Sequence, residues 1–267
     1  MAMNGSGAAD RPADWERVPN HVLYRRIRHD VARLVADRPD AAVLPVPACP
    51  EWTVRDLVDH LADVCTVATR RLTTGEFVRP GRVPTPGAPA LPRLLDSWAE
   101  RGERLDELVA ASTDRLSDVL VMDAFTHELD LRHALGSPPP AGHPAYPGML
   151  DFVANAVLAQ VSTLGLPPLE IVTPGARWTN QGERPAVTLA AADRHDLYRT
   201  LTGRRTHEQI AALSWSRDPG AWLPAFSWGP FTPPATPVEE PTHGRKHGRT
   251  AHGGQVDTGQ EGASRDR

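Results

Sequence analysis

Apolar residues recur at intervals of three and four positions through the first half of the chain, which is the spacing of amphipathic helices. Four segments show this spacing: 15–37, 53–75, 91–111 and 116–135. Short or moderate connections separate them, and four helices joined in this way predict an up-and-down four-helix bundle.

Capping residues and prolines set the expected ends of these helices. Thr53 precedes the second helix and Asp56 follows three positions later, a variant of the capping box. Gly136 and the prolines after it end the fourth helix. Between 44 and 50 three prolines exclude a helix, so this segment is expected to run extended across the surface.

The pattern changes in the second half of the chain, where short alternating runs follow one further helix. The expected helix covers 148–164, and the expected strands are 169–173, 176–179 and 186–190. Asp193 caps a helix that ends at Gly203, and Thr206 with Gln209 forms another capping box. The chain is therefore expected to have an α+β fold.

Domain limits follow from these elements and from composition. We expect a helical bundle over 15–142 and a small α+β domain over 143–232. Residues 1–14 and 233–267 contain little that could be buried, so both terminal segments are expected to be disordered.

Composition narrows the classes of function. The net charge of the 267 residues is −4, and no long basic run is present, so nucleic acid is not an expected partner. No stretch approaches the roughly 20 apolar residues of a membrane span, and the first residues lack a signal peptide's apolar core. Two cysteines provide no disulfide framework. A cytoplasmic protein acting on small molecules, as a monomer or homodimer, is expected.

Three polar residues interrupt the apolar faces of the second and fourth helices. His60 lies within the apolar arc of its helix, and Asp123 and His127 stand one turn apart on the other. A buried carboxylate needs a partner, so either Asp123 and His127 form an internal pair and His60 is a core histidine, or all three bind a divalent metal. Two imidazoles, one carboxylate and an open position are typical of catalytic zinc, although nickel or iron(II) accepts the same ligands.

Asp130 follows His127 by three positions. It is expected either to accept a hydrogen bond from a metal-binding imidazole or to pair with Arg132 or Arg55.

Three runs of sequence resemble a known family. The run Cys49–Leu61, CPEWTVRDLVDHL, resembles the CPGWTVRDLVAHL opening of the mycothiol-dependent maleylpyruvate isomerase family, a group of DinB-like metal-binding bundles. The run Asp123–Leu131, DAFTHELDL, resembles the second signature of that family, a carboxylate four residues before a histidine. The run Leu201–Arg204 is similar to the LTGR of its C-terminal, sterol-carrier-like domain. The resemblance covers about 20–230.

The resemblance implies that His60, Asp123 and His127 bind zinc and that the cofactor is mycothiol, an actinobacterial thiol. Its metal-bound thiolate would add to an electrophilic carbon of a small substrate, giving an S-conjugate or, after thiol loss, a cis–trans isomer. Two positions depart from the family pattern: Asp123 stands where the isomerases have glutamate, and Glu51 stands where they have glycine.

Other interpretations of the same residues remain open. The three ligands could instead activate water in a metal-dependent hydrolase, or the metal could be structural in a protein that binds a small ligand. Arg204 is a candidate catalytic residue that would bind a substrate carboxylate, or else a solvated arginine at a helix end. Cys49 and Cys65 are interpreted as packing residues.

Overall fold

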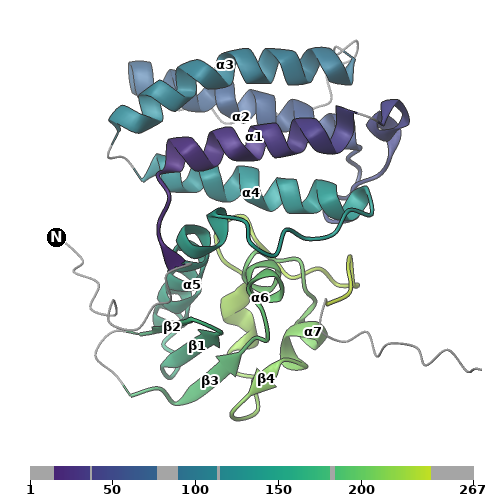
Figure 1. Ribbon diagram of the computed structural model, residues 1–267. Coiled ribbons are helices and arrows are strands. Elements are labelled where there is room, and N and C mark those ends of the chain that lie inside the picture. Colours follow the sequence, from purple (N-terminus) through teal and green to yellow (C-terminus); the bar gives the residue numbers. More distant parts are fainter. Residues whose placement is uncertain (1–14, 37, 77–89, 113–114, 181–183, 242–267) are drawn as a thin grey trace, which may run out of the picture.

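The computed structural model describes residues 15–36, 38–76, 90–112, 115–180 and 184–241 (Figure 1). Its first half consists of four long helices, with a short 3-10 helix η2 (Pro39–Val43) between the first two. The four are α1 (Asn20–Ala36), α2 (Val54–Thr74), α3 (Leu91–Ala111) and α4 (Leu116–Ala134). The predicted helices are confirmed, except that the first begins at Asn20, after Pro19, and not at Trp15.

The predicted capping box of α2 is present. The Thr53 hydroxyl accepts a hydrogen bond from the backbone N–H of Asp56, and the Asp56 carboxylate accepts one from the backbone N–H of Thr53. Gly75 ends the helix in the left-handed conformation. Local sequence signals therefore fix both ends of the helix that carries His60.

The order of the helices differs from the simple up-and-down bundle that the sequence predicted. Asn20 at the start of α1 binds Asp118 at the start of α4, and Arg38 just after α1 binds the Leu135 carbonyl just after α4. Helices α1 and α4 therefore run in the same direction, as Figure 1 also shows. In an up-and-down bundle the first and fourth helices are antiparallel. Helical periodicity does not encode this order.

The segment expected to be extended between 44 and 50 is compact instead. Pro45 and Thr53 form a β-bridge, and the chain between them folds back in tight turns. Val46 is buried at 2% exposure. The prolines exclude a helix there, as expected, but they are compatible with turns.

The second half is a four-stranded mixed sheet with helices, which confirms the α+β fold class. The strands are β1 (Leu169–Thr173), β2 (Ala176–Thr179), β3 (Val187–Ala190) and β4 (Ser214–Trp215), in the order β2-β1-β3-β4. Only β1 and β3 pair in parallel. The helical elements are α5 (Ala145–Thr163), α6 (Arg194–Leu201), α7 (His207–Ala211) and the 3-10 helix η3 (Leu223–Phe226). The two-residue β4 was not predicted.

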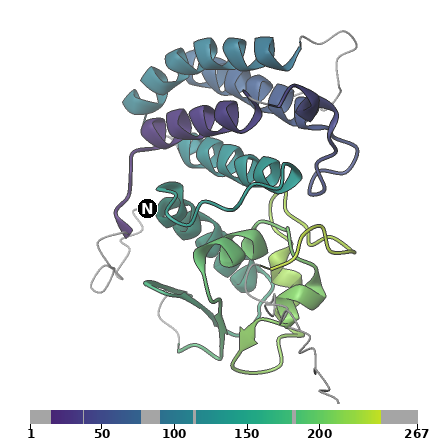
Figure 2. The ribbon, with the colours of Figure 1, turned by 45° about the vertical axis from the view of Figure 1, so that its right-hand side comes forward.

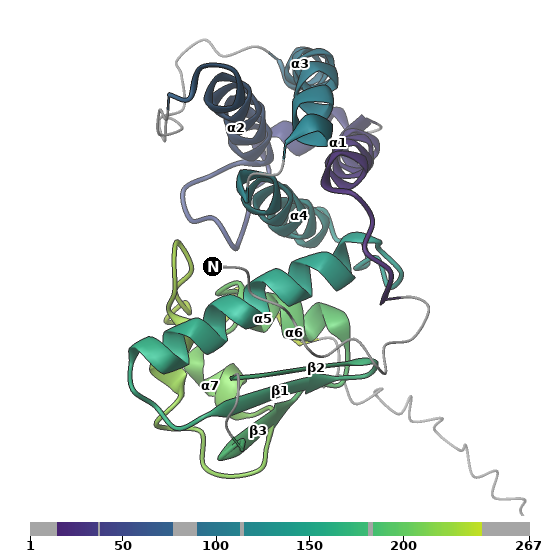
Figure 3. The ribbon, with the colours of Figure 1, turned by 90° about the vertical axis from the view of Figure 1, so that its left-hand side faces the viewer.

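Helix α4 lies between the other three long helices and the second half of the chain (Figure 3). Phe125 of α4 contacts Tyr146 of α5 and Tyr198 of α6, each with ring centroids 5.0 Å apart. The side chains of α4 are accordingly buried around most of its circumference. This position lets α4 present residues to both halves.

Ion pairs of Glu239 hold the last described segment, residues 233–241, in place. Residues 233–241, predicted to be disordered, run beside the end of α4 (Figure 2), and Glu239 is only 8% exposed. Its carboxylate binds Arg199 at 2.7 and 2.8 Å and also binds Arg205. An argument from apolar composition misses such an ionic anchor. The expected disorder of 1–14 and 242–267 lies outside the described residues.

Across the described ranges, no helix combines the length and the apolar character that crossing a membrane requires.

Candidate metal centre

Helices α2 and α4 bring His60, Asp123 and His127 together. Nε2 of His60 lies 3.7 Å from Oδ2 of Asp123, and Nε2 of His127 lies 3.6 Å from Oδ1 of the same carboxylate. One ligand atom from each of the three residues lies within 4.8 Å of the other two. The side chains are 18%, 27% and 12% exposed in that order, so the group lies half-buried and open to solvent.

The spacing of these atoms fits a metal ion better than it fits hydrogen bonds. Distances of 3.6 and 3.7 Å are too long for hydrogen bonds, and the largely buried Oδ2 of Asp123 has no hydrogen-bond partner. Two ligands of a tetrahedral zinc, each about 2.1 Å from the metal, are about 3.4 Å apart. The donor set of two imidazole nitrogens and one carboxylate oxygen is also one that zinc accepts.

Asp130 fixes the orientation of His127. Its Oδ2 lies 3.0 Å from Nδ1 of His127, within hydrogen-bond distance. A carboxylate only accepts, so Nδ1 carries the proton and the Nε2 lone pair faces Asp123 and His60. The contact between Asp130 and an imidazole is the one expected, whereas the arginines that Asp130 binds are not the expected Arg132 or Arg55. A carboxylate behind the imidazole is the usual support of a metal-binding histidine.

Two arginines hold Asp130 in place. Arg204 donates to both carboxylate oxygens, at 3.2 and 2.7 Å, and Arg199 lies 2.7 Å from Oδ1. Although burial alone would raise the pKa of Asp130, the charges of Arg204 and Arg199 hold that pKa well below its usual range. Asp130 is therefore ionised and keeps its acceptor role toward His127.

The expectations for Arg204 need correction. The residue is 8% exposed, so it is not a solvated arginine. Its Nε and Nη2 bind Asp130 and its Nη1 binds the Thr202 carbonyl, so all three nitrogens have protein partners. The bidentate geometry expected toward a substrate carboxylate is directed at Asp130, so Arg204 reaches the candidate centre through Asp130 and His127.

Trp52 forms one wall of the centre and was not singled out from the sequence. Its ring centroid lies 5.1 Å from that of His60 and 6.5 Å from that of His127. The His60 and His127 rings themselves meet edge to face at 5.2 Å. One sequence signal could have identified Trp52: it directly precedes the capping residue Thr53, and the cap fixes how the chain enters α2, the helix that carries His60.

Neither cysteine has the environment of a nucleophile. Burial, and next the charge of Asp130, raises the pKa of the Cys49 thiol to about 12. Cys65 is fully buried, and burial raises its pKa as well. Both remain thiols at neutral pH, in agreement with their interpretation as packing residues.

A second polar cluster lies deeper, at the junction of the two halves. Nε2 of His143 lies 3.5 Å from carboxylate oxygens of both Asp30 and Glu128, and all three residues are buried. Nδ1 of His143 accepts a hydrogen bond from the backbone N–H of Ala145, so the neutral ring carries its proton on Nε2. That proton faces the carboxylates, and Arg26, Arg33 and Arg132 surround them. Among the described residues neither Nε2 of His143 nor Oε2 of Glu128 has a hydrogen-bond partner, but the arginines compensate the two carboxylates and the protonated Nε2 offers no lone pair to a cation.

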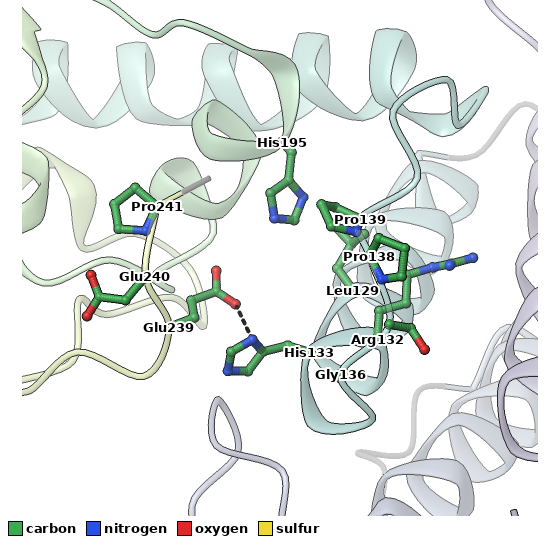
Figure 4. A pocket seen from close by; sticks show the side chains of 11 residues that line it. Leu129, Arg132, His133, Gly136, Pro138, Pro139, His195, Glu239, Glu240 and Pro241 are labelled. Atoms are coloured by element: carbon green, nitrogen blue, oxygen red, sulfur yellow. Dashed lines mark ion pairs between the residues drawn. The ribbon is translucent and has the colours of Figure 1, made fainter. Parts of the chain in front are cut away.

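A cavity between the two halves lies away from the metal centre. It has a volume of about 510 Å³ and is lined by the end of α4, the start of α6 and the segment 239–241 (Figure 4). Leu129, Arg132 and His133 line it from α4, on the side of that helix turned away from His127. None of the three residues His60, Asp123 and His127 lines this cavity.

Comparison with known proteins supports the same assignment of fold. Residues 23–137 match the family model of the DinB superfamily. Two solved structures, a mycothiol-dependent maleylpyruvate isomerase and its mutant with a histidine replaced by alanine, match 74% of this chain and 92% of theirs. Each has 14% sequence identity to the chain and a TM-score of 0.50. No curated protein matches the chain.

An identity of 14% shows a common fold and does not carry over an activity. The helical half of the chain is thus similar to DinB superfamily domains over residues 23–137, and 74% of the chain shares the fold of the mycothiol-dependent maleylpyruvate isomerase.

Proposed function

We propose that the protein is a metal- and mycothiol-dependent enzyme, an S-transferase or a maleylpyruvate-type isomerase, acting on a small electrophile. The observation that carries the proposal is the convergence of His60, Asp123 and His127 in a half-buried site, with Asp130 behind His127. The fold common to this chain and the mycothiol-dependent isomerase supports the choice of thiol.

His60, Asp123 and His127 would hold the metal, most simply zinc, and leave one position open. A divalent ion there would stabilise a bound thiol as its thiolate. The partly exposed side of the triad gives thiol and substrate access, whereas Trp52 closes another side with an apolar surface. The neighbouring Cys49 remains protonated and does not compete as a nucleophile.

The replacement of glutamate by Asp123 does not remove the site. An aspartate is one methylene shorter, so the two helices must approach more closely for it to reach both histidines. Both carboxylate oxygens already lie within 3.7 Å of an imidazole nitrogen. The shorter side chain therefore suits this packing of α2 against α4.

Metal analysis of protein purified without a histidine tag is the first test, with calorimetry of mycothiol binding as the second. We expect one divalent ion per chain and mycothiol binding that requires it. His127→Ala should lose both, because two remaining ligands rarely hold zinc. His133→Ala is the matched control, since this histidine lies on the same helix, is 39% exposed and lies outside the triad.

The alternatives give different results in the same assays. A metal-dependent hydrolase would turn over without thiol, and a ligand-binding protein with a structural metal would bind metal but catalyse no thiol-dependent reaction. Either outcome, or full thiol-transfer activity in His127→Ala, would contradict the proposal.

A further inference from the structure

We infer that Glu239, in the last described segment, is a positioning residue of the candidate metal centre and acts on His127 through Arg199 and Asp130. The inference rests on the proposed function, because it takes His127 as a metal ligand. It adds to that function a residue from the second half of the chain and a role for the segment that carries it.

Direct contacts connect Glu239 to the histidine. Its carboxylate accepts hydrogen bonds from Nε and Nη2 of Arg199, at 2.7 and 2.8 Å. The same Nη2 lies 2.7 Å from Oδ1 of Asp130, and Oδ2 of Asp130 lies 3.0 Å from Nδ1 of His127. The side chains of Arg199 and Asp130 are fully buried and that of Glu239 is 5% exposed, so solvent ions screen these contacts little.

The two carboxylates share one nitrogen of Arg199. Because Nη2 contacts both Glu239 and Asp130, the positive charge of Arg199 is divided between two anions. Without the charge of Glu239, Arg199 would attract Asp130 more strongly. Asp130 would then accept more weakly from Nδ1 of His127, since neighbouring hydrogen bonds polarise one another.

The ion pairs around Arg199 form a balanced network. Its members are three arginines and three carboxylates, all of them buried: Arg199, Arg204, Arg205, Asp130, Asp196 and Glu239. Loss of the Glu239 charge leaves one positive charge of these six residues without a counter-charge, which is costly for a buried group. Asp130 is the other carboxylate that contacts Arg199, so the imbalance acts next to His127.

The backbone of Glu239 is held separately from its carboxylate. The side-chain amide of Gln209, in α7, donates a hydrogen bond to the Glu239 carbonyl at 2.9 Å. A substitution of the Glu239 side chain therefore leaves this backbone contact in place. The effect of the charge can then be tested apart from the position of the segment.

Two measurements on zinc-loaded protein test the inference without relying on turnover. The first is the zinc dissociation constant, determined by competition with a chelator. The second is the NMR resonance of the Nδ1 proton of His127, in protein labelled with ¹⁵N-histidine, which reports the hydrogen bond to Asp130 directly. Loss of stability alone would not move this resonance in protein that remains folded.

Glu239→Gln should weaken zinc binding by about three- to tenfold. This is less than the roughly 10- to 100-fold typical when the carboxylate beside a metal-binding histidine is itself removed, because Glu239 acts one contact further away. The Nδ1 proton of His127 should move upfield, the direction that accompanies a weaker hydrogen bond.

Asp196→Asn is the matched control. It makes the same change of charge in the same network, but at Arg205, which Asp196 binds at 2.8 Å. Both readouts should stay close to their wild-type values. A wild-type Nδ1 resonance in Glu239→Gln, or an equal loss of zinc affinity in Asp196→Asn, overturns the inference.

Glu239→Asp keeps the charge on a side chain one methylene shorter, and it decides the question if Glu239→Gln does not fold. The Nδ1 resonance should then move in the same direction by a smaller amount, and an unchanged resonance overturns the inference. Wild-type protein that binds no zinc contradicts the proposed function and removes the inference with it. Wild-type zinc binding that the Glu239 variants leave intact overturns the inference alone.

Discussion

Nδ1 of His127 lies 3.0 Å from Oδ2 of Asp130, and this contact joins the candidate metal centre to the second half of the chain. Asp130 is bound by Arg199 and Arg204, which belong to α6 and the loop after it. The second half of the chain thus helps to determine the direction in which Nε2 of His127 points. The candidate metal centre therefore depends on both halves, although all three proposed ligands come from the helical one.

Asp130→Asn should weaken metal binding by about 10- to 100-fold, the range typical for loss of a carboxylate behind a metal-binding histidine. An amide can still accept from Nδ1 but no longer neutralises Arg199 and Arg204. The measurement is the zinc dissociation constant, determined by competition with a chelator.

Asp106→Asn provides the control for lost stability. Asp106 is also buried and also bound by two arginines, Arg25 at 2.9 Å and Arg28 at 2.7 Å, but it belongs to α3. This variant should unfold at lower denaturant concentration and keep its zinc affinity. Equal loss of zinc affinity in both variants would show that Asp130 acts only through global stability.

Glu51→Gly should stabilise the fold by about 1 kcal/mol, because a residue with a Cβ is strained at positive φ. Glu51 has φ 73° and is exposed. The backbone N–H of Trp52 binds the Cys49 carbonyl at 3.0 Å, closing a turn with Pro50 and Glu51 at its centre. A type II turn places glycine at this position.

Urea unfolding at neutral pH measures the effect. Glu51→Ala retains the Cβ and should show no comparable gain, so a gain of similar size in both variants would contradict the strain argument. The result also bears on the metal centre, because this turn places Trp52 against His60.

The sequence predicted local structure well because local signals are strong. The capping box at Thr53 and the glycine at 75 fixed α2, and the one-turn spacing of Asp123 and His127 placed both side chains on one face. Bringing His60 to the same point required knowledge of which helices are neighbours. The residue pattern left this arrangement open as one of two alternatives, and the family resemblance favoured it.

What could not be predicted depends on contacts between distant residues. The parallel arrangement of α1 and α4 depends on contacts between distant residues, such as that of Asn20 with Asp118. The burial of Arg204 depends on Asp130, which is 74 residues away. Glu239 looked like part of an unstructured tail because its partners are charged and not apolar. Ionic pairing carries no periodicity that a sequence pattern could show.

Gly102→Ala should destabilise the protein by about 1–3 kcal/mol through overpacking. A Cβ at Gly102 would overlap the guanidinium of Arg28, which is buried and held by Asp106. Arg28 cannot move without breaking that ion pair inside the bundle.

Gly148→Ala is the matched control for this substitution. Gly148 lies within α5, and apart from its chain neighbours and the adjacent backbone of the helix no atom of the described residues lies within 4 Å of the place that an alanine Cβ would occupy there. Helix propensity should make this variant more stable by about 0.5–1 kcal/mol. Chemical denaturation of both variants gives the comparison, and a neutral Gly102→Ala would mean that Arg28 has another low-energy position.

Glu239→Gln should reveal how strongly the last described segment is anchored, through a dependence of stability on pH. Burial alone would raise the pKa of Glu239, but the charges of Arg199 and Arg205 outweigh it and lower this pKa from 4.5 to about 2. A carboxyl whose pKa is lower in the folded state stabilises the fold above its unfolded pKa, and this contribution is lost as pH falls through the folded value. It is therefore complete at pH 7 and lost between about pH 4.5 and 2.

The shift corresponds to about 3 kcal/mol at pH 7, at 1.36 kcal/mol for each pKa unit. Urea unfolding should show a gap of about this size between the wild type and Glu239→Gln at pH 7, narrowing to about half or less by pH 3. Glu240→Gln is the control, because the adjacent Glu240 is exposed, and it should follow the wild type at both pH values. A gap that stays constant with pH would mean that Glu239 stabilises the segment by packing and not by its charge.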